Sequence, residues 1–198
     1  MYDILRKSIA SKVSVTDEEW NTILEKTESI SVKKNSFFQI QDTTSRYEGF
    51  VLKGAFKIYT IDENGSENIL FFSFEGDWIC DIESFYYKKN SQYNVKAIED
   101  SELAIISRAN KSYLFKIVPK MLEFHTIMLE RANIVMQKRL LDVLHKNAIQ
   151  RYLDFVKRYP TKYRVINNKN LSSYLGVSQE FLSKIKKTIA QQEKDFQK

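Results

Sequence analysis

The pattern of apolar and polar positions changes character along the chain. From Thr16, the string TDEEWNTILEK begins with a helix-capping residue, places acidic side chains in the first turn and keeps its apolar positions on one helical face. This predicts a short helix at about 16–27. Between residues 30 and 107, β-branched and aromatic runs are separated by Gly, Asn and Asp, which is typical of a series of short strands.

Turn signals divide the strand region. Asn64-Gly65 lies between the runs KIYTID and NILFFSF and predicts a hairpin with a type I′ turn, in which both central residues have positive φ. Gly54 and Gly76-Asp77 mark further turns. Six or more short strands without interleaved long helices predict an antiparallel barrel or sandwich.

A long helix is predicted from Pro119 to about His145, where the apolar residues form more than one stripe. One stripe, made up of Met121, Phe124, Met128 and Val135, would pack on the strand domain. The other stripe needs a partner, and we expect a homodimer interface there. Its members are Leu122, Leu129, Met136, Leu140 and Val143. The alternative is a central helix buried inside one subunit.

Composition restricts the class of protein. The chain has 198 residues, of which 43% are hydrophobic and 13% aromatic, so we expect a globular protein of one or two domains. It has no apolar run of membrane-spanning length and no signal-peptide core, which predicts a cytoplasmic protein without a membrane partner.

One cysteine, Cys80, and two histidines argue against a disulfide, a metal site or another cofactor. A metal-dependent cupin enzyme is the remaining enzymatic alternative, and residues 30–107 contain no His. We expect no enzymatic activity.

Positive charge is concentrated at the C-terminal end. Residues 146–198 hold 12 Lys and Arg against 4 Asp and Glu, whereas residues 1–145 hold 19 against 21. The basic block also carries Tyr, Phe and Leu at helical spacing. It therefore predicts a folded module that neutralises phosphates, with a solvated basic surface as the alternative.

Within this block, residues 168–187 read NKNLSSYLGVSQEFLSKIKK and fit a helix-turn-helix. Leu171 and Leu175 are one helical turn apart, Gly176 permits a left-handed turn, and Ser178 is placed to cap the second helix. The outward positions of that second helix are polar, as required of a helix that reads a DNA groove.

The order of these parts resembles the Crp/Fnr family of bacterial transcription regulators. The resemblance is carried by FVLKGAFKIY (50–59), GDWICDIESF (76–85), QYNVKAIEDSELAIIS (92–107) and YLGVSQEFLSKIKK (174–187). It implies an α+β fold with an N-terminal antiparallel, cupin-like β-roll of the cyclic-nucleotide-binding type at 1–118, a dimerisation helix at 119–145 and a DNA-binding domain at 146–198. If the chain has the family's wing, it is expected at about 162–166 and in reduced form.

The resemblance also implies a function. It predicts a dimeric, sequence-specific transcription regulator that binds a pseudo-palindromic operator in double-stranded DNA, contacts RNA polymerase and takes an unidentified small-molecule effector in the roll. The base-reading candidates are Ser178, Gln179, Glu180 and Lys184. The candidate phosphate contacts are Lys169, Ser183, Lys186 and Lys187.

The expected effector pocket departs from the family pattern. Cyclic-nucleotide-binding members carry a Gly-Glu pair and an Arg-Ser pair where this chain has Cys80-Asp81 and Ser91-Gln92. A buried phosphate without its guanidinium is costly, so cyclic AMP binding is not expected. The pocket candidates are Gly76, Asp77, Cys80, Asp81, Ser91, Gln92 and Tyr93. A ligand-independent regulator or a nucleotide-binding-like interaction module is the alternative function.

Overall fold

The computed structural model describes residues 2–195. The chain divides into two compact units. The first comprises the chain up to Thr60 together with Leu70–Met136, and the second comprises Ile61–Ile69 together with the chain from Gln137. Three elements, strands β4 (Ala55–Ile61) and β5 (Glu67–Phe74) and helix α5 (Lys120–His145), each run from one unit into the other.

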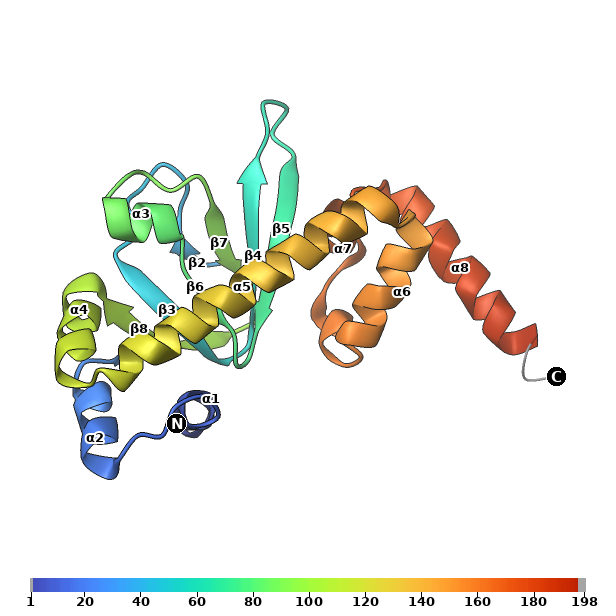
Figure 1. Cartoon of the computed structure of the whole chain (residues 1–198). Helices are drawn as coiled ribbons and strands as arrows, with labels where there is room; N and C mark the ends of the chain where they lie inside the picture. The colour runs from blue at the N-terminus through green and yellow to red at the C-terminus, as the bar shows by residue number, and fades with distance from the viewer. Residues whose placement is uncertain (1, 196–198) are drawn as a thin grey trace. The chain divides into compact units, whose positions relative to one another are not determined.

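The first unit is built around two four-stranded antiparallel sheets (Figure 1). One sheet has the order β1-β8-β3-β6 and the other β2-β7-β4-β5. The strands are β1 (Glu28–Val32), β2 (Phe37–Gln39), β3 (Tyr47–Lys53), β4 (Ala55–Ile61), β5, β6 (Trp78–Ile79), β7 (Asn94–Ala97) and β8 (Ser101–Ser107). The predicted α+β class with an antiparallel strand domain is confirmed.

Four shorter helices accompany the sheets. They are α1 (Asp3–Ala10), α2 (Asp17–Glu25), α3 (Ile82–Tyr87) and α4 (Arg108–Ile117). The helix predicted at about 16–27 is confirmed as α2, where Thr16 and Glu19 form a reciprocal capping box. The strand pattern did not predict α3, which begins where the Asp81 side chain accepts a hydrogen bond from the Ser84 amide.

Two apolar clusters hold this unit together. In one, Val51, Phe56 and Leu103 are fully buried between strands of the two sheets. In the other, α1, α2, α4 and the first turns of α5 cover β3 and β8. Met121 and Phe124 lie in this second cluster and Met128 packs against it, so the N-terminal part of the predicted inner stripe packs on the first unit. Val135, predicted to belong to the same stripe, is instead 47% exposed.

The hairpin between β4 and β5 forms as predicted, but its turn is of a different type. Gly65 has a φ of 76°, whereas Asn64 is absent from the residues with positive φ, so the turn is not type I′. The Asp62 carboxylate accepts hydrogen bonds from the amides of Asn64 and Ser66. The Gly65 amide also donates to the Asp62 carbonyl. This Asp-based loop is longer than the two-residue turn that Asn-Gly alone indicates.

In the second unit, the end of α5 is followed by α6 (Ala148–Arg158), a 3₁₀ helix (Lys162–Val165), α7 (Asn168–Leu175) and α8 (Gln179–Asp195). The wing expected at 162–166 is therefore replaced by a helical turn, because Tyr163 and Arg164 donate backward to carbonyls of the preceding turn. No helix within residues 2–195 is long and apolar enough to cross a membrane.

Candidate functional sites

Helices α7 and α8 are joined by a short turn, in which Gly176 and Ser178 have the roles that the sequence predicted. Gly176 ends α7 in the left-handed conformation with a φ of 67°. The Ser178 hydroxyl accepts a hydrogen bond of 3.1 Å from the Phe181 amide and so caps α8. Leu171 and Leu182 are fully buried, Ile185 is buried as well, and the two helices are in contact.

The outer face of α8 is polar and exposed. Ser178, Gln179, Glu180 and Lys184, predicted to read bases, are all exposed at its N-terminal end. Hydrogen bonds from its own backbone amide and from Ser178 lower the pKa of Glu180, so this side chain is an ionised acceptor at neutral pH. These four residues present donors and acceptors from the first two turns of one helix.

The predicted phosphate contacts do not share one environment. Lys169 on α7 and Lys187 on α8 are exposed. Ser183 donates to the Gln179 carbonyl within α8 at 3.0 Å. The ammonium of Lys186 is 2.6 Å from the Asn168 side-chain oxygen and joins α8 to the start of α7. Lys186 therefore has an intramolecular partner that the sequence did not reveal.

In the first unit, three of the predicted pocket residues come together. The Ser91 hydroxyl donates to the Asp81 carboxylate at 2.7 Å, and the Tyr93 amide donates to the Ser91 oxygen at 3.1 Å. Both Asp81 and Ser91 are buried. Burial, and then the negative charges of Asp81 and Glu83, raise the pKa of Tyr93. Asp81 and Ser91 thus form an internal hydrogen-bonded pair at this corner.

The other pocket candidates have different roles. Gly76, with a φ of 93°, and Asp77 form the turn before β6, where the Asp77 carboxylate accepts from the Phe74 amide. Gln92 is exposed. Burial raises the pKa of the Cys80 thiol, which is therefore protonated and unreactive at neutral pH.

A buried ion pair next to this corner was not found from the sequence. The Lys111 ammonium of α4 lies 2.5 Å from the Glu48 carboxylate of β3, and both side chains are almost completely buried. Beside it, the Tyr86 hydroxyl is 3.1 Å from the His125 imidazole of α5. Burial, reinforced by the positive charge of Lys111, lowers the pKa of His125 to about 4. No local pattern could indicate contacts between residues so far apart in sequence.

The outer stripe of α5 is exposed along its whole length. Leu122, Leu129, Met136, Leu140 and Val143 expose between 40% and 61% of their surface. An apolar stripe this exposed is unusual for a lone helix in water and is typical of a helix that meets a partner. Among residues 2–195, no group of three or more His, Cys, Asp or Glu side chains is arranged to hold a metal ion.

Residues 29–116 match the family model of the cyclic nucleotide-binding domain. FixK2 from Bradyrhizobium japonicum has a similar structure, with a TM-score of 0.73 and 18% identity over 84% of this chain and 86% of that one. CLP, a c-di-GMP-responsive global regulator of Xanthomonas campestris, has a TM-score of 0.73 and 12% identity over 90% and 93%. A protein from Eubacterium rectale assigned to the Crp/Fnr family has a TM-score of 0.67 and 14% identity over 90% and 85%. The chain has the fold of the Crp/Fnr regulators.

The resemblance to Crp/Fnr regulators that the sequence motifs indicated is thereby confirmed at the level of fold. The two matches span 84% and 90% of the chain. No curated protein sequence matches the chain at a significant level.

Proposed function

We propose that the protein is a dimeric, sequence-specific DNA-binding transcription regulator. The observation that carries this proposal is the arrangement of α7 and α8. The two helices are in contact and their apolar residues Leu171, Leu175, Leu182 and Ile185 are buried. Gln179, Glu180 and Lys184 are exposed on a capped helix. This is a helix-turn-helix whose second helix suits the major groove, in a unit with an excess of positive charge.

The side chains on α8 suggest which bases are contacted. Glu180 is suited to accept from a cytosine amino group, Gln179 to pair with adenine, and Lys184 to donate to guanine or to a phosphate. Lys169 and Lys187 extend the same surface and would neutralise phosphates.

Dimerisation is part of the proposal. The five exposed residues of the outer α5 stripe are spaced by seven, four and three residues, as at the core positions of a two-stranded coiled coil. A second copy of the chain would cover this stripe with the same stripe. Two copies would then present two α8 helices to successive major grooves, about 34 Å apart.

A specific observation favours a second candidate, a regulator that needs no effector in the roll. The buried Ser91 hydroxyl and the buried Asp81 carboxylate pair with each other at 2.7 Å. A ligand phosphate entering this corner would meet a carboxylate and no guanidinium. The protein would then bind its operator without a small-molecule signal, or respond to one that does not use a cyclic phosphate.

Selection from random DNA duplexes tests the proposed function. We expect enrichment of a two-fold-symmetric sequence, bound by the purified chain in the absence of any nucleotide. If the chain binds all duplexes equally strongly, and its affinity varies with salt concentration but not with sequence, the basic surface exists but the proposed reading helix is rejected.

A further inference from the structure

We propose that Lys146 and Arg151 form a polar joint that fixes the angle between α5 and the helix-turn-helix, and so selects the half-site spacing of the operator. The inference rests on the proposed function, because spacing matters only for a dimer that reads two half-sites. It assigns a positioning role to two basic residues that do not lie on the reading helix.

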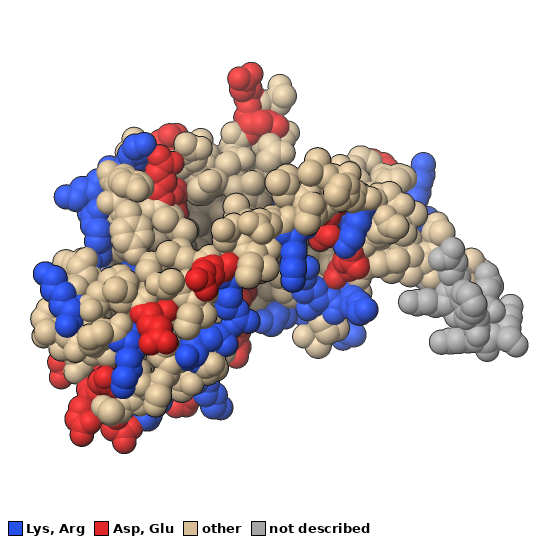
Figure 2. All heavy atoms as spheres, viewed as in Figure 1, with Lys and Arg blue, Asp and Glu red and all other residues tan. Residues whose placement is uncertain are grey.

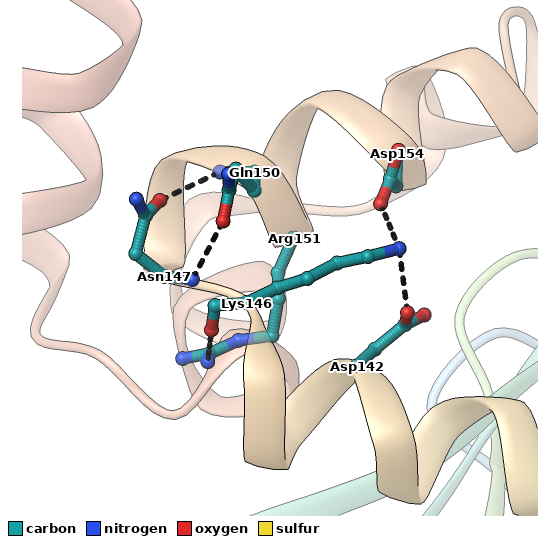
Figure 3. A network of polar contacts seen from close by, with 6 residues as sticks. All are labelled: Asp142, Lys146, Asn147, Gln150, Arg151 and Asp154. Atoms are coloured by element: carbon teal, nitrogen blue, oxygen red, sulfur yellow. Dashed lines mark hydrogen bonds and ion pairs between the residues drawn. The ribbon is translucent and has the colours of Figure 1, made fainter.

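Lys146 occupies the junction between α5 and α6 and holds a carboxylate on each side (Figure 3). Its ammonium lies 2.6 Å from Asp142, in the last turns of α5, and 2.6 Å from Asp154, two turns into α6. These pairs raise the pKa of Lys146 and lower the pKa of Asp154, which favours the charged form of both groups. A single side chain thus restrains two helix axes.

Arg151 connects the same junction to the helix-turn-helix. One guanidinium nitrogen donates to the Lys146 carbonyl at 2.6 Å, and another donates to the Leu175 carbonyl at 3.0 Å. Leu175 is the last residue of α7 and precedes the turn residue Gly176. The planar guanidinium therefore holds the junction and the end of α7 at a set separation.

The junction itself has little freedom. Only Lys146 and Asn147 separate α5 from α6, and the Lys146 amide still donates to the Asp142 carbonyl. Asn147 and Gln150 form a reciprocal capping box, which fixes the direction in which α6 begins. A short, capped and doubly paired connection behaves as a joint of defined angle.

The joint lies at one side of an open groove of about 470 Å³ between α5 and α6. In Figure 2, Lys and Arg atoms gather around acidic atoms where these helices meet. Three further cations line this groove, Lys138, Lys157 and Arg158. No ion pair is recorded for Lys138 among the described residues, so it provides a control with the same charge in the same groove but without a role in the joint.

The experiment compares operators that differ only in the number of base pairs between identical half-sites. The wild type is expected to prefer one spacing sharply. Lys146→Met and Arg151→Met should bind a single half-site duplex as the wild type does, while their discrimination between the best spacing and a spacing two base pairs longer falls roughly tenfold. Lys146→Arg should keep much of the discrimination, because it can still pair with both carboxylates.

The matched control is Lys138→Met, which removes one positive charge from the groove and should leave the spacing preference unchanged. If Lys146→Met and Arg151→Met retain the sharp preference of the wild type, or if Lys138→Met loses it equally, the joint is refuted. If the wild type binds no half-site duplex selectively, the proposed function fails instead. Thermal unfolding of each variant separates a loosened joint from an unfolded domain.

Discussion

Ser91 and Asp81 form a buried, internally paired corner of the first unit. In the roll, the carboxylate of Asp81 both caps α3 and accepts the Ser91 hydroxyl, so this buried anion is already satisfied by the protein. A second anion placed beside it would lack a cationic partner and would be repelled.

At this scale we predict that cyclic AMP does not bind at micromolar concentrations. The cyclic phosphate would lack a bidentate Arg partner, and charge-assisted hydrogen bonds are worth about 1.5–3 kcal/mol each. Isothermal titration calorimetry with the purified chain measures this directly. A dissociation constant in the micromolar range would contradict the prediction and would direct attention to Lys88, Lys89 or Lys96 as the substitute charge.

The reading helix gives a second prediction for single residues. Glu180→Ala should relax sequence preference at one base pair of each half-site, at about 1–3 kcal/mol, because one base-edge contact is lost. Lys187→Ala should weaken binding to all sequences and reduce the salt slope by about one per phosphate contact. Competition binding to operator and non-operator DNA over a salt series distinguishes the two. Identical behaviour of both variants would reject Glu180 as a base-reading residue.

Between α7 and α8, the turn depends on the backbone conformation of one residue. Gly176 has positive φ, and a Cβ added there would meet no atom within 4 Å. The cost of a side chain is therefore conformational and not steric crowding by neighbours.

We predict that Gly176→Ala lowers the free energy of unfolding by about 1 kcal/mol. Gly176→Asn should recover part of this loss, because Asn tolerates the left-handed region better than Ala. The measurement is the midpoint of denaturant unfolding of each variant, compared at an unchanged dependence of the free energy of unfolding on denaturant concentration. Equal stability of the Ala and Asn variants would show that the turn relaxes into another conformation.

Helix α5 carries a prediction about assembly. Met136→Glu places a charge in the centre of the exposed apolar stripe and should convert dimers to monomers, since an unpaired buried charge costs several kcal/mol. Gln137→Glu adds the same charge at the neighbouring position outside the stripe and should leave the dimer intact. Sedimentation velocity at micromolar concentration measures both. A wild type that sediments as a monomer would overturn the proposed interface.

Across the whole molecule, stability should depend on pH through His125. Because burial and Lys111 hold its pKa at about 4, below the ordinary 6.5, the unfolded chain takes up a proton that the folded chain does not. The free energy of unfolding is therefore highest above pH 6.5, where His125 is neutral in both states, and it decreases as the pH falls from 6.5 toward 4. We expect His125→Gln to reduce this slope, whereas the exposed His145 can be replaced by Gln without effect. Urea unfolding at pH 7, 6 and 5 measures how the free energy of unfolding changes with pH. The same change with pH in both variants would contradict the prediction.

Local chemistry determined much of what the sequence predicted correctly. The capped helix at Thr16, the turn at Gly176 and the Ser178 cap each depend on residues no more than five apart, and the structure has each of them. The same holds for the first turns of α5, where the spacing alone separates the buried Met121 and Phe124 from the exposed Leu122. Farther along the helix, Val135 is exposed although the pattern placed it in the inner stripe.

Tertiary structure decided the features that join distant residues. Lys186 pairs with Asn168, Ser91 with Asp81, and Arg151 bridges the α5–α6 junction and the end of α7. The wing expected at 162–166 became a 3₁₀ helix, and the Asn-Gly turn became an Asp-based loop. The residue type determines which groups a side chain can hydrogen-bond. The actual partner of that side chain depends on which groups the folded backbone brings within about 3 Å. The sequence by itself determined the elements and the surfaces they expose, whereas the internal partners of the polar side chains were settled only when those elements packed.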